Sequence, residues 1–129
     1  MVTYKNTQYL YSIELTLDLI GGKWKSLILW YLGENTLRFS ELRRALPQVT
    51  QKMLTHQLRD LEENRLINRF IHTQIPPKVE YSLTETGKSL LPILATLNDW
   101  GIYFANQAES TGAKRLLETC QVAAPIKKS

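Results

Sequence analysis

The fold is decided by residues 40–64, SELRRALPQVTQKMLTHQLRDLEEN. A short helix is predicted from Ser40, a good N-cap residue, to Leu46. It ends there because Pro47 disfavours a helical conformation at the residue before it. Thr50 is then expected to cap a second helix that runs to the end of the stretch. Two short helices joined by a tight turn are typical of a helix-turn-helix.

The second of these helices is amphipathic. At about 100° per residue, Leu54, Leu58 and Leu61 fall on the side that is expected to pack against the preceding helix. The opposite side is polar, and most of its side chains carry donors that reach a base edge or a phosphate. The candidate base-contacting residues are Gln51, Lys52, Thr55, His56 and Arg59.

A β-hairpin is predicted directly after the helix-turn-helix. Residues 68–73 and 79–83 are rich in strand-forming side chains, and the segment 75–78 between them contains two prolines. A hairpin in this position is the wing of a winged helix, and Lys78 is expected at its tip. Before the helix-turn-helix, helices are expected at residues 9–20 and 23–32 and a short strand at 36–39.

A long helix is predicted after the wing, from the capping residue Thr84 to residue 105, with a kink at Pro92. A last short helix is expected at residues 113–120. The long helix has more apolar residues than one buried stripe needs, so it either completes the domain's own core or packs against a partner helix. These residues are Ile93, Leu97, Trp100, Ile102, Tyr103 and Phe104.

The elements together predict a mainly α fold with a small β-hairpin wing, a winged helix-turn-helix. We expect one domain over residues 1–129 with a DNA-binding core at 36–84.

The positive charge is concentrated where this fold would touch DNA. The 129 residues carry a net charge of +4, from 16 Lys and Arg against 12 Asp and Glu. From Arg38 to Lys78 there are eight basic and four acidic residues, so this segment alone accounts for the surplus. Double-stranded DNA is therefore the expected partner. Backbone contacts are expected from Arg38, Ser40, Arg43 and Lys78.

Other classes of protein are disfavoured. No G-x-S-x-G, H-E-x-x-H, P-loop or G-x-G-x-x-G motif occurs, so we expect no enzyme. His56 and His72 lie on different elements without a Cys or carboxylate at ligand spacing, so neither a metal site nor a cofactor is expected. The single cysteine, Cys120, excludes an intrachain disulfide. No apolar run is long enough for a membrane span, and a soluble, cytoplasmic protein is expected.

Four motifs, in this order, resemble the HxlR-type regulators, bacterial relatives of the MarR winged-helix proteins. They are LIGGKW at 19–24, RFSEL at 38–42, KML at 52–54 followed by LRDLE at 58–62, and VEYSLT at 79–84 with Gly87. The resemblance implies a DNA-binding transcriptional regulator that works as a homodimer on a pseudo-palindromic operator. It also implies dimerisation through the helices at 9–20 and 84–120. The residues expected there are Ile13, Leu17, Ile93, Leu97, Trp100 and Phe104.

The sequence departs from the family at one position. Many members carry a Cys-Pro pair shortly before the Gly-Gly-Lys-Trp motif, and in some of them that thiol senses oxidants. Here Tyr11-Ser12 stands in its place. A redox role of Cys120 is left open beside the simpler interpretation of an incidental or packed thiol.

Two further interpretations are also left open. A small apolar effector would fit an aromatic-lined cavity, although its lining residues serve equally well as core. These are Trp24, Tyr31, Trp100 and Tyr103. The alternative function is a winged helix that acts as a protein–protein adaptor without binding DNA. The basic face of the second helix of the helix-turn-helix favours DNA, because an adaptor does not need it.

Overall fold

The computed structural model describes residues 1–110. The chain divides into two compact units, Met1–Lys88 and one that begins at Ser89. Within residues 1–110, no helix combines the length and apolar character needed to cross a membrane. The first unit contains β1 (Val2–Tyr4), β2 (Thr7–Tyr9), α1 (Ser12–Ile20), α2 (Gly22–Leu32), β3 (Leu37–Arg38), α3 (Phe39–Ala45), α4 (Gln51–Glu63), β4 (Ile67–His72), β5 (Lys78–Leu83) and α5 (Glu85–Lys88). The described part of the second contains α6 (Leu91–Ser110).

The chain begins with a small hairpin that the sequence did not predict. Strands β1 and β2 pair antiparallel, with Val2 opposite Tyr9. Their two-residue turn, Lys5 and Asn6, has φ angles of 49° and 64°. Two successive left-handed residues match the right-handed twist of paired strands. The predicted helix at 9–20 therefore begins only at Ser12, because Tyr9 belongs to β2 and Tyr11 is the N-cap.

The joint between α1 and α2 consists of one residue. Gly21 is both the C-cap of α1 and the N-cap of α2. A Cβ atom at Gly21 would overlap the carbonyl oxygen of Leu17 in the last turn of α1, so the end of α1 has no room for a side chain at this position. The next residue, Gly22, has a φ of 74°, which also favours glycine.

The helix-turn-helix is confirmed and is held by leucines. Leu54, Leu58 and Leu61 of α4 are buried, as the periodicity predicted, and Leu42 of α3 is buried with them. In the same unit, α2 contributes Ile28, Leu29 and Leu32 to the buried core. The apolar face of α4 thus packs against the core of this unit, and the opposite face of α4 points outward.

The start of α3 differs from the prediction. The helix begins at Phe39 and its N-cap is Arg38, so Ser40 lies in the first turn and is not the cap. The backbone N–H of Arg38 donates to Oε1 of Glu41 at 2.8 Å. A carboxylate three residues into the helix thus satisfies the cap backbone. The cap falls there because β3 (Leu37–Arg38) is only two residues long and the helix follows it directly.

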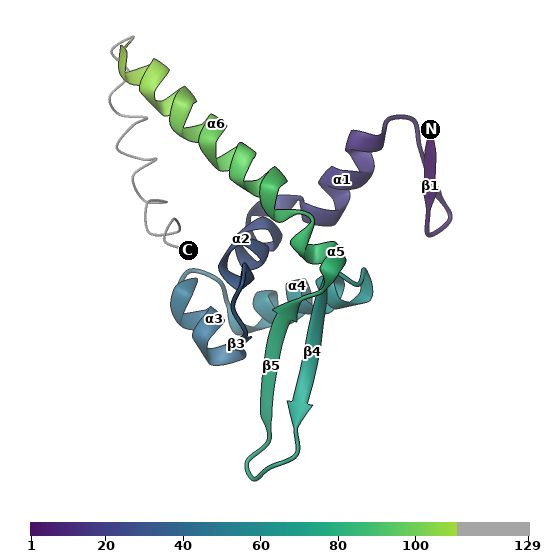
Figure 1. Ribbon diagram of the computed structural model, residues 1–129, viewed down its shortest axis with the longest axis vertical. Coiled ribbons are helices and arrows are strands. Elements are labelled where there is room, and N and C mark those ends of the chain that lie inside the picture. Colours follow the sequence, from purple (N-terminus) through teal and green to yellow (C-terminus); the bar gives the residue numbers. More distant parts are fainter. Residues whose placement is uncertain (111–129) are drawn as a thin grey trace. The chain divides into compact units, whose positions relative to one another are not determined.

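The predicted wing is confirmed. Strands β4 and β5 pair antiparallel from Ile67 opposite Leu83 to His72 opposite Lys78. Strand β3 pairs with the other edge of β5, giving the order β3-β5-β4. The hairpin extends away from the helices of the first unit (Figure 1).

The predicted long helix is two helices. Thr84 caps α5 as expected, since its hydroxyl accepts from the N–H of Gly87 at 2.9 Å. However, α5 ends at Lys88 and α6 begins at Leu91. Pro92 is the second residue of α6, where a missing N–H costs no helical hydrogen bond, so it marks a helix start and not a kink. The helix predicted at 113–120 and Cys120 lie outside the described residues.

Candidate nucleic-acid interface

Helix α4 presents a polar face anchored at its N-terminus. The side chain of Thr50 accepts a hydrogen bond from the N–H of Met53 at 3.0 Å, which confirms the predicted cap. On the side away from the buried leucines, Lys52, His56 and Arg59 are exposed. All three belong to one helix, so its backbone fixes the positions of their Cβ atoms relative to each other.

A groove lies between α4 and the three-stranded sheet, with a volume of about 430 Å³. Three of the predicted base-contacting residues line it: Gln51, Thr55 and Arg59. Arg69 of β4 lines the same groove, and the sequence had not singled it out. The other lining residues are Phe39, Leu58, Glu62 and Tyr81. The groove therefore joins arginines from the helix and from the wing, while Lys52 and His56 are not among its lining residues.

The predicted backbone contacts divide into two groups. Arg38 and Ser40 are exposed at the start of α3. Arg43 is only half-buried, and its Nε atom is buried without a hydrogen-bond partner in the described residues. The Nε edge of its guanidinium is therefore not open to solvent.

Lys78 does not lie at the tip of the wing. It is the first residue of β5, and its Nζ lies 3.3 Å from Oε2 of Glu80. The other carboxylate oxygen of Glu80 lies 2.7 Å from Nε2 of His72. The hydrogen bond from His72, together with Lys78, holds the pKa of Glu80 below its usual value. The charge of Lys78 is thus balanced within the wing, and residues 73–77 at the tip carry none.

The predicted dimerisation residues are all exposed. On α1, Ile13 is 66% and Leu17 56% exposed. On α6 the exposed large apolar side chains are Ile93, Leu97, Trp100, Ile102, Tyr103 and Phe104. Trp100 and Phe104 stack with ring centroids 5.4 Å apart. Each helix, taken by itself, presents an apolar face to solvent.

The model of the HxlR-like helix-turn-helix family matches residues 19–109. The chain belongs to this family. An HTH-type transcriptional regulator from Methanothermobacter thermautotrophicus is 50% identical over 107 residues, which cover 83% of this chain and 82% of the relative. The relatives are named HTH-type transcriptional regulators, which supports a DNA-binding transcriptional regulator.

Solved structures agree with this assignment. The redox regulator HypR in its reduced form is 46% identical with a TM-score of 0.74, and the match covers 78% of this chain and 99% of HypR. A MarR-family transcriptional regulator from Enterococcus faecalis V583 is 38% identical with a TM-score of 0.70, covering 84% of this chain and 99% of that one. The resemblance to HxlR-type and MarR-type winged-helix proteins is therefore confirmed.

Two expectations about small ligands stay predictions. Within residues 1–110, no group of three or more His, Cys, Asp or Glu side chains is arranged to hold a metal ion. The residues expected around an apolar effector belong to different units: Trp24 and Tyr31 to α2, Trp100 and Tyr103 to α6.

Proposed function

We propose that this HxlR-like regulator binds a pseudo-palindromic operator as a homodimer. Each α4 enters a major groove, with the residue range 36–84 acting as the DNA-binding core. Lys52, His56 and Arg59 face the bases from the outward side of α4, and Gln51 and Thr55 do so from its flank. Arg38 and Ser40 at the start of α3 bind the backbone, with Arg43 nearby. Lys78, paired with Glu80, contributes less than an unpaired lysine would.

One observation carries this proposal. The outward face of α4 is basic and exposed, because its leucines are buried on the opposite side. The groove beside it brings Arg59 of α4 and Arg69 of β4 to one depression. A phosphate between helix and wing would meet two guanidinium groups there, each able to form bidentate hydrogen bonds.

The homodimer is supported by the exposed apolar faces of α1 and α6. Exposed large apolar side chains gathered on one helix are typical of a protein–protein contact. A two-fold dimer would place two α4 helices about 34–36 Å apart, one turn of DNA, and its operator would share that symmetry.

The test is selection of bound sequences from a random duplex pool, followed by fluorescence anisotropy on the selected operator and on a random duplex. We expect a two-fold symmetric consensus and a steep negative dependence of log affinity on log salt. Lys52→Ala should lower discrimination by about 1–3 kcal/mol if Lys52 contacts a base. Lys88→Ala, a lysine of α5 paired with Glu85, is the matched control and should leave discrimination unchanged.

Two results would contradict the proposal. Failure of the protein to bind any duplex at low salt favours the adaptor alternative. An equal loss on operator and random duplex for Lys52→Ala removes that residue from base contact and assigns it to phosphate.

A further inference from the structure

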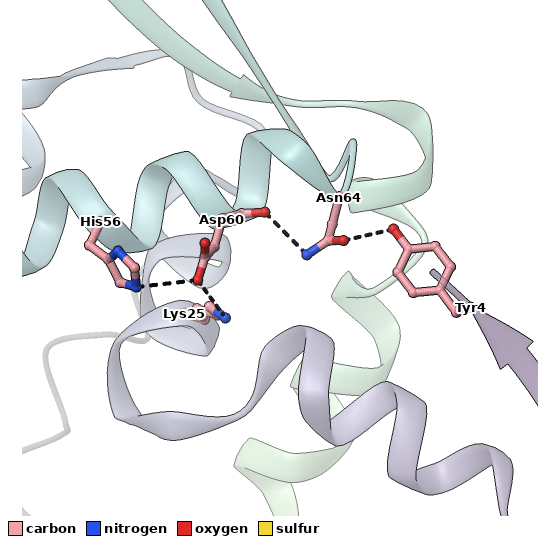
Figure 2. A network of polar contacts seen from close by, with 5 residues as sticks. All are labelled: Tyr4, Lys25, His56, Asp60 and Asn64. Atoms are coloured by element: carbon pink, nitrogen blue, oxygen red, sulfur yellow. Dashed lines mark hydrogen bonds and ion pairs between the residues drawn. The ribbon is translucent and has the colours of Figure 1, made fainter. Parts of the chain in front are cut away.

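Asp60 lies at the centre of a polar network in the first unit (Figure 2). Its Oδ2 atom lies 3.4 Å from Nζ of Lys25 on α2 and 3.6 Å from Nε2 of His56, one turn earlier on α4. The side chain of Lys25 is 16% exposed, whereas that of His56 is 67% exposed. Lys25 therefore holds the carboxylate from the protein side, and the carboxylate faces a largely exposed imidazole.

The turn that carries Asp60 is itself fixed. Asn64 caps the C-terminus of α4, and its Nδ2 donates to the backbone oxygen of Asp60 at 3.2 Å. The Oδ1 of Asn64 accepts a hydrogen bond from the hydroxyl of Tyr4 at 2.7 Å. The N-terminal hairpin thus braces the last turn of α4 (Figure 2). Asp60 is anchored on both its backbone and its side chain.

Helix geometry places Asp60 next to the side of α4 that is proposed to face DNA. His56 lies about 160° around the helix axis from the buried Leu58, so it points away from the core. Residues four apart differ by about 40°, which places Asp60 on the flank of α4 beside His56. An exposed imidazole without a partner samples several rotamers, and ordering it on binding costs free energy. A carboxylate held beside it reduces that cost.

We propose that Asp60 is a positioning residue for sequence recognition, and that it acts through His56. The inference rests on the proposed function. A carboxylate beside the DNA-facing surface repels phosphates on every sequence, whereas an ordered His56 helps only on the correct bases. Asp60 therefore raises the affinity for the operator and lowers the affinity for random DNA. These two effects have opposite signs, and a residue that merely stabilises the helix produces neither.

The experiment measures the affinity of the full chain for the selected operator and for a random duplex in four variants: Asp60→Asn, His56→Ala, both together, and Glu63→Gln. Asp60→Asn should weaken operator binding by about tenfold, the size of one lost base contact. On random duplex it should bind as well as the wild type or better. In the His56→Ala background, Asp60→Asn should change operator affinity less than twofold, because the two residues act as one unit.

Glu63→Gln is the matched control. It removes the same charge from an exposed position of the same helix, so it should leave the operator preference unchanged. A fifth variant, Asp60→Glu, restores a carboxylate and should recover part of the preference. Melting temperatures of all variants separate recognition from stability, since a structural role lowers both affinities in step with the melting temperature.

Three outcomes would overturn the inference. The first is an operator preference of Asp60→Asn equal to that of Glu63→Gln. The second is an equal loss from Asp60→Asn with and without His56. The third is a wild type that binds no duplex, which overturns the proposed function and this inference with it, whereas the first two leave the proposed function standing.

Discussion

At the scale of single residues, Gly21 is a position with no room for a side chain. Replacing it by alanine adds a Cβ atom that overlaps the backbone oxygen of Leu17, and backbone cannot move aside as a flexible side chain can. We expect Gly21→Ala to lower the free energy of unfolding by about 1–3 kcal/mol, the range for overpacking. Thermal and denaturant unfolding measure it.

Gly101 provides the control for that substitution. It lies inside α6, and a Cβ atom there would meet nothing within 4 Å. Gly101→Ala should therefore be neutral or stabilise the chain by up to about 1 kcal/mol, since alanine favours helix over glycine. A Gly21→Ala protein as stable as the Gly101→Ala protein would contradict the close-approach argument.

Arg69 shows what residue-level prediction from sequence could not find. Its segment was correctly predicted as a strand, but which strand residues line the groove depends on the register, which places Arg69 opposite Tyr81. A one-residue slip would turn Arg69 to the other face of the sheet. The residues of α4 were easier, because helical periodicity assigns faces without knowledge of a partner.

At the scale of elements, the wing is expected to respond to acid. Its carboxylate, Glu80, has a pKa held below the usual value of 4.5, first by the hydrogen bond from His72 and then by Lys78. A lowered folded pKa means that Glu80 stabilises the wing above the unfolded pKa, and that this contribution is lost as pH falls through the folded pKa. Amide hydrogen exchange of β4 and β5 between about pH 6 and pH 3 measures it, after correction for the pH dependence of intrinsic exchange.

Glu80→Gln is the matched variant for that titration. It keeps the size of the side chain and removes the charge, so the acid-dependent loss of protection in the wing should disappear. The same loss in wild type and variant would show that another group is responsible.

The break between α5 and α6 was the main error among the elements. The sequence indicated a continuous helix with a kink because apolar residues recur on both sides of Pro92. Hydrophobic periodicity indicates which residues share one face of a helix. It does not reveal that the helix is interrupted for two residues, here between Lys88 and Leu91. The proline itself fits a helix start as well as a kink, and only the backbone decides between them.

At the scale of the whole molecule, the order of elements from α1 to the wing could be predicted, because each has its own cap, breaker or period. Thr50 and Pro47 are examples whose local signals the structure confirms. The N-terminal hairpin could not be predicted, since three-residue strands carry almost no pattern. The hairpin contributes a contact between residues far apart in the sequence, from Tyr4 to Asn64, and local sequence patterns do not predict such a contact.

The homodimer makes a prediction at this scale. Leu97 is 54% exposed on α6, and Leu97→Glu places a charge on the proposed contact face. We expect the wild type to sediment as a dimer and the variant as a monomer with reduced operator affinity, because a charge in an apolar interface pays a desolvation cost. Gln107→Glu, an exposed polar position of the same helix, should remain dimeric. A monomeric wild type would contradict the proposal.

The stacked pair Trp100 and Phe104 has a practical consequence. The indole is 60% exposed on α6, whereas the other tryptophans, Trp24 and Trp30, belong to α2 in the first unit. A second copy that covers α6 would move Trp100 from water into an apolar environment. Its emission would then shift to longer wavelength on dilution, and subtracting the spectrum of Trp100→Phe isolates that signal. The intrinsic fluorescence of Trp100 would thus report the assembly of the protein without an attached dye.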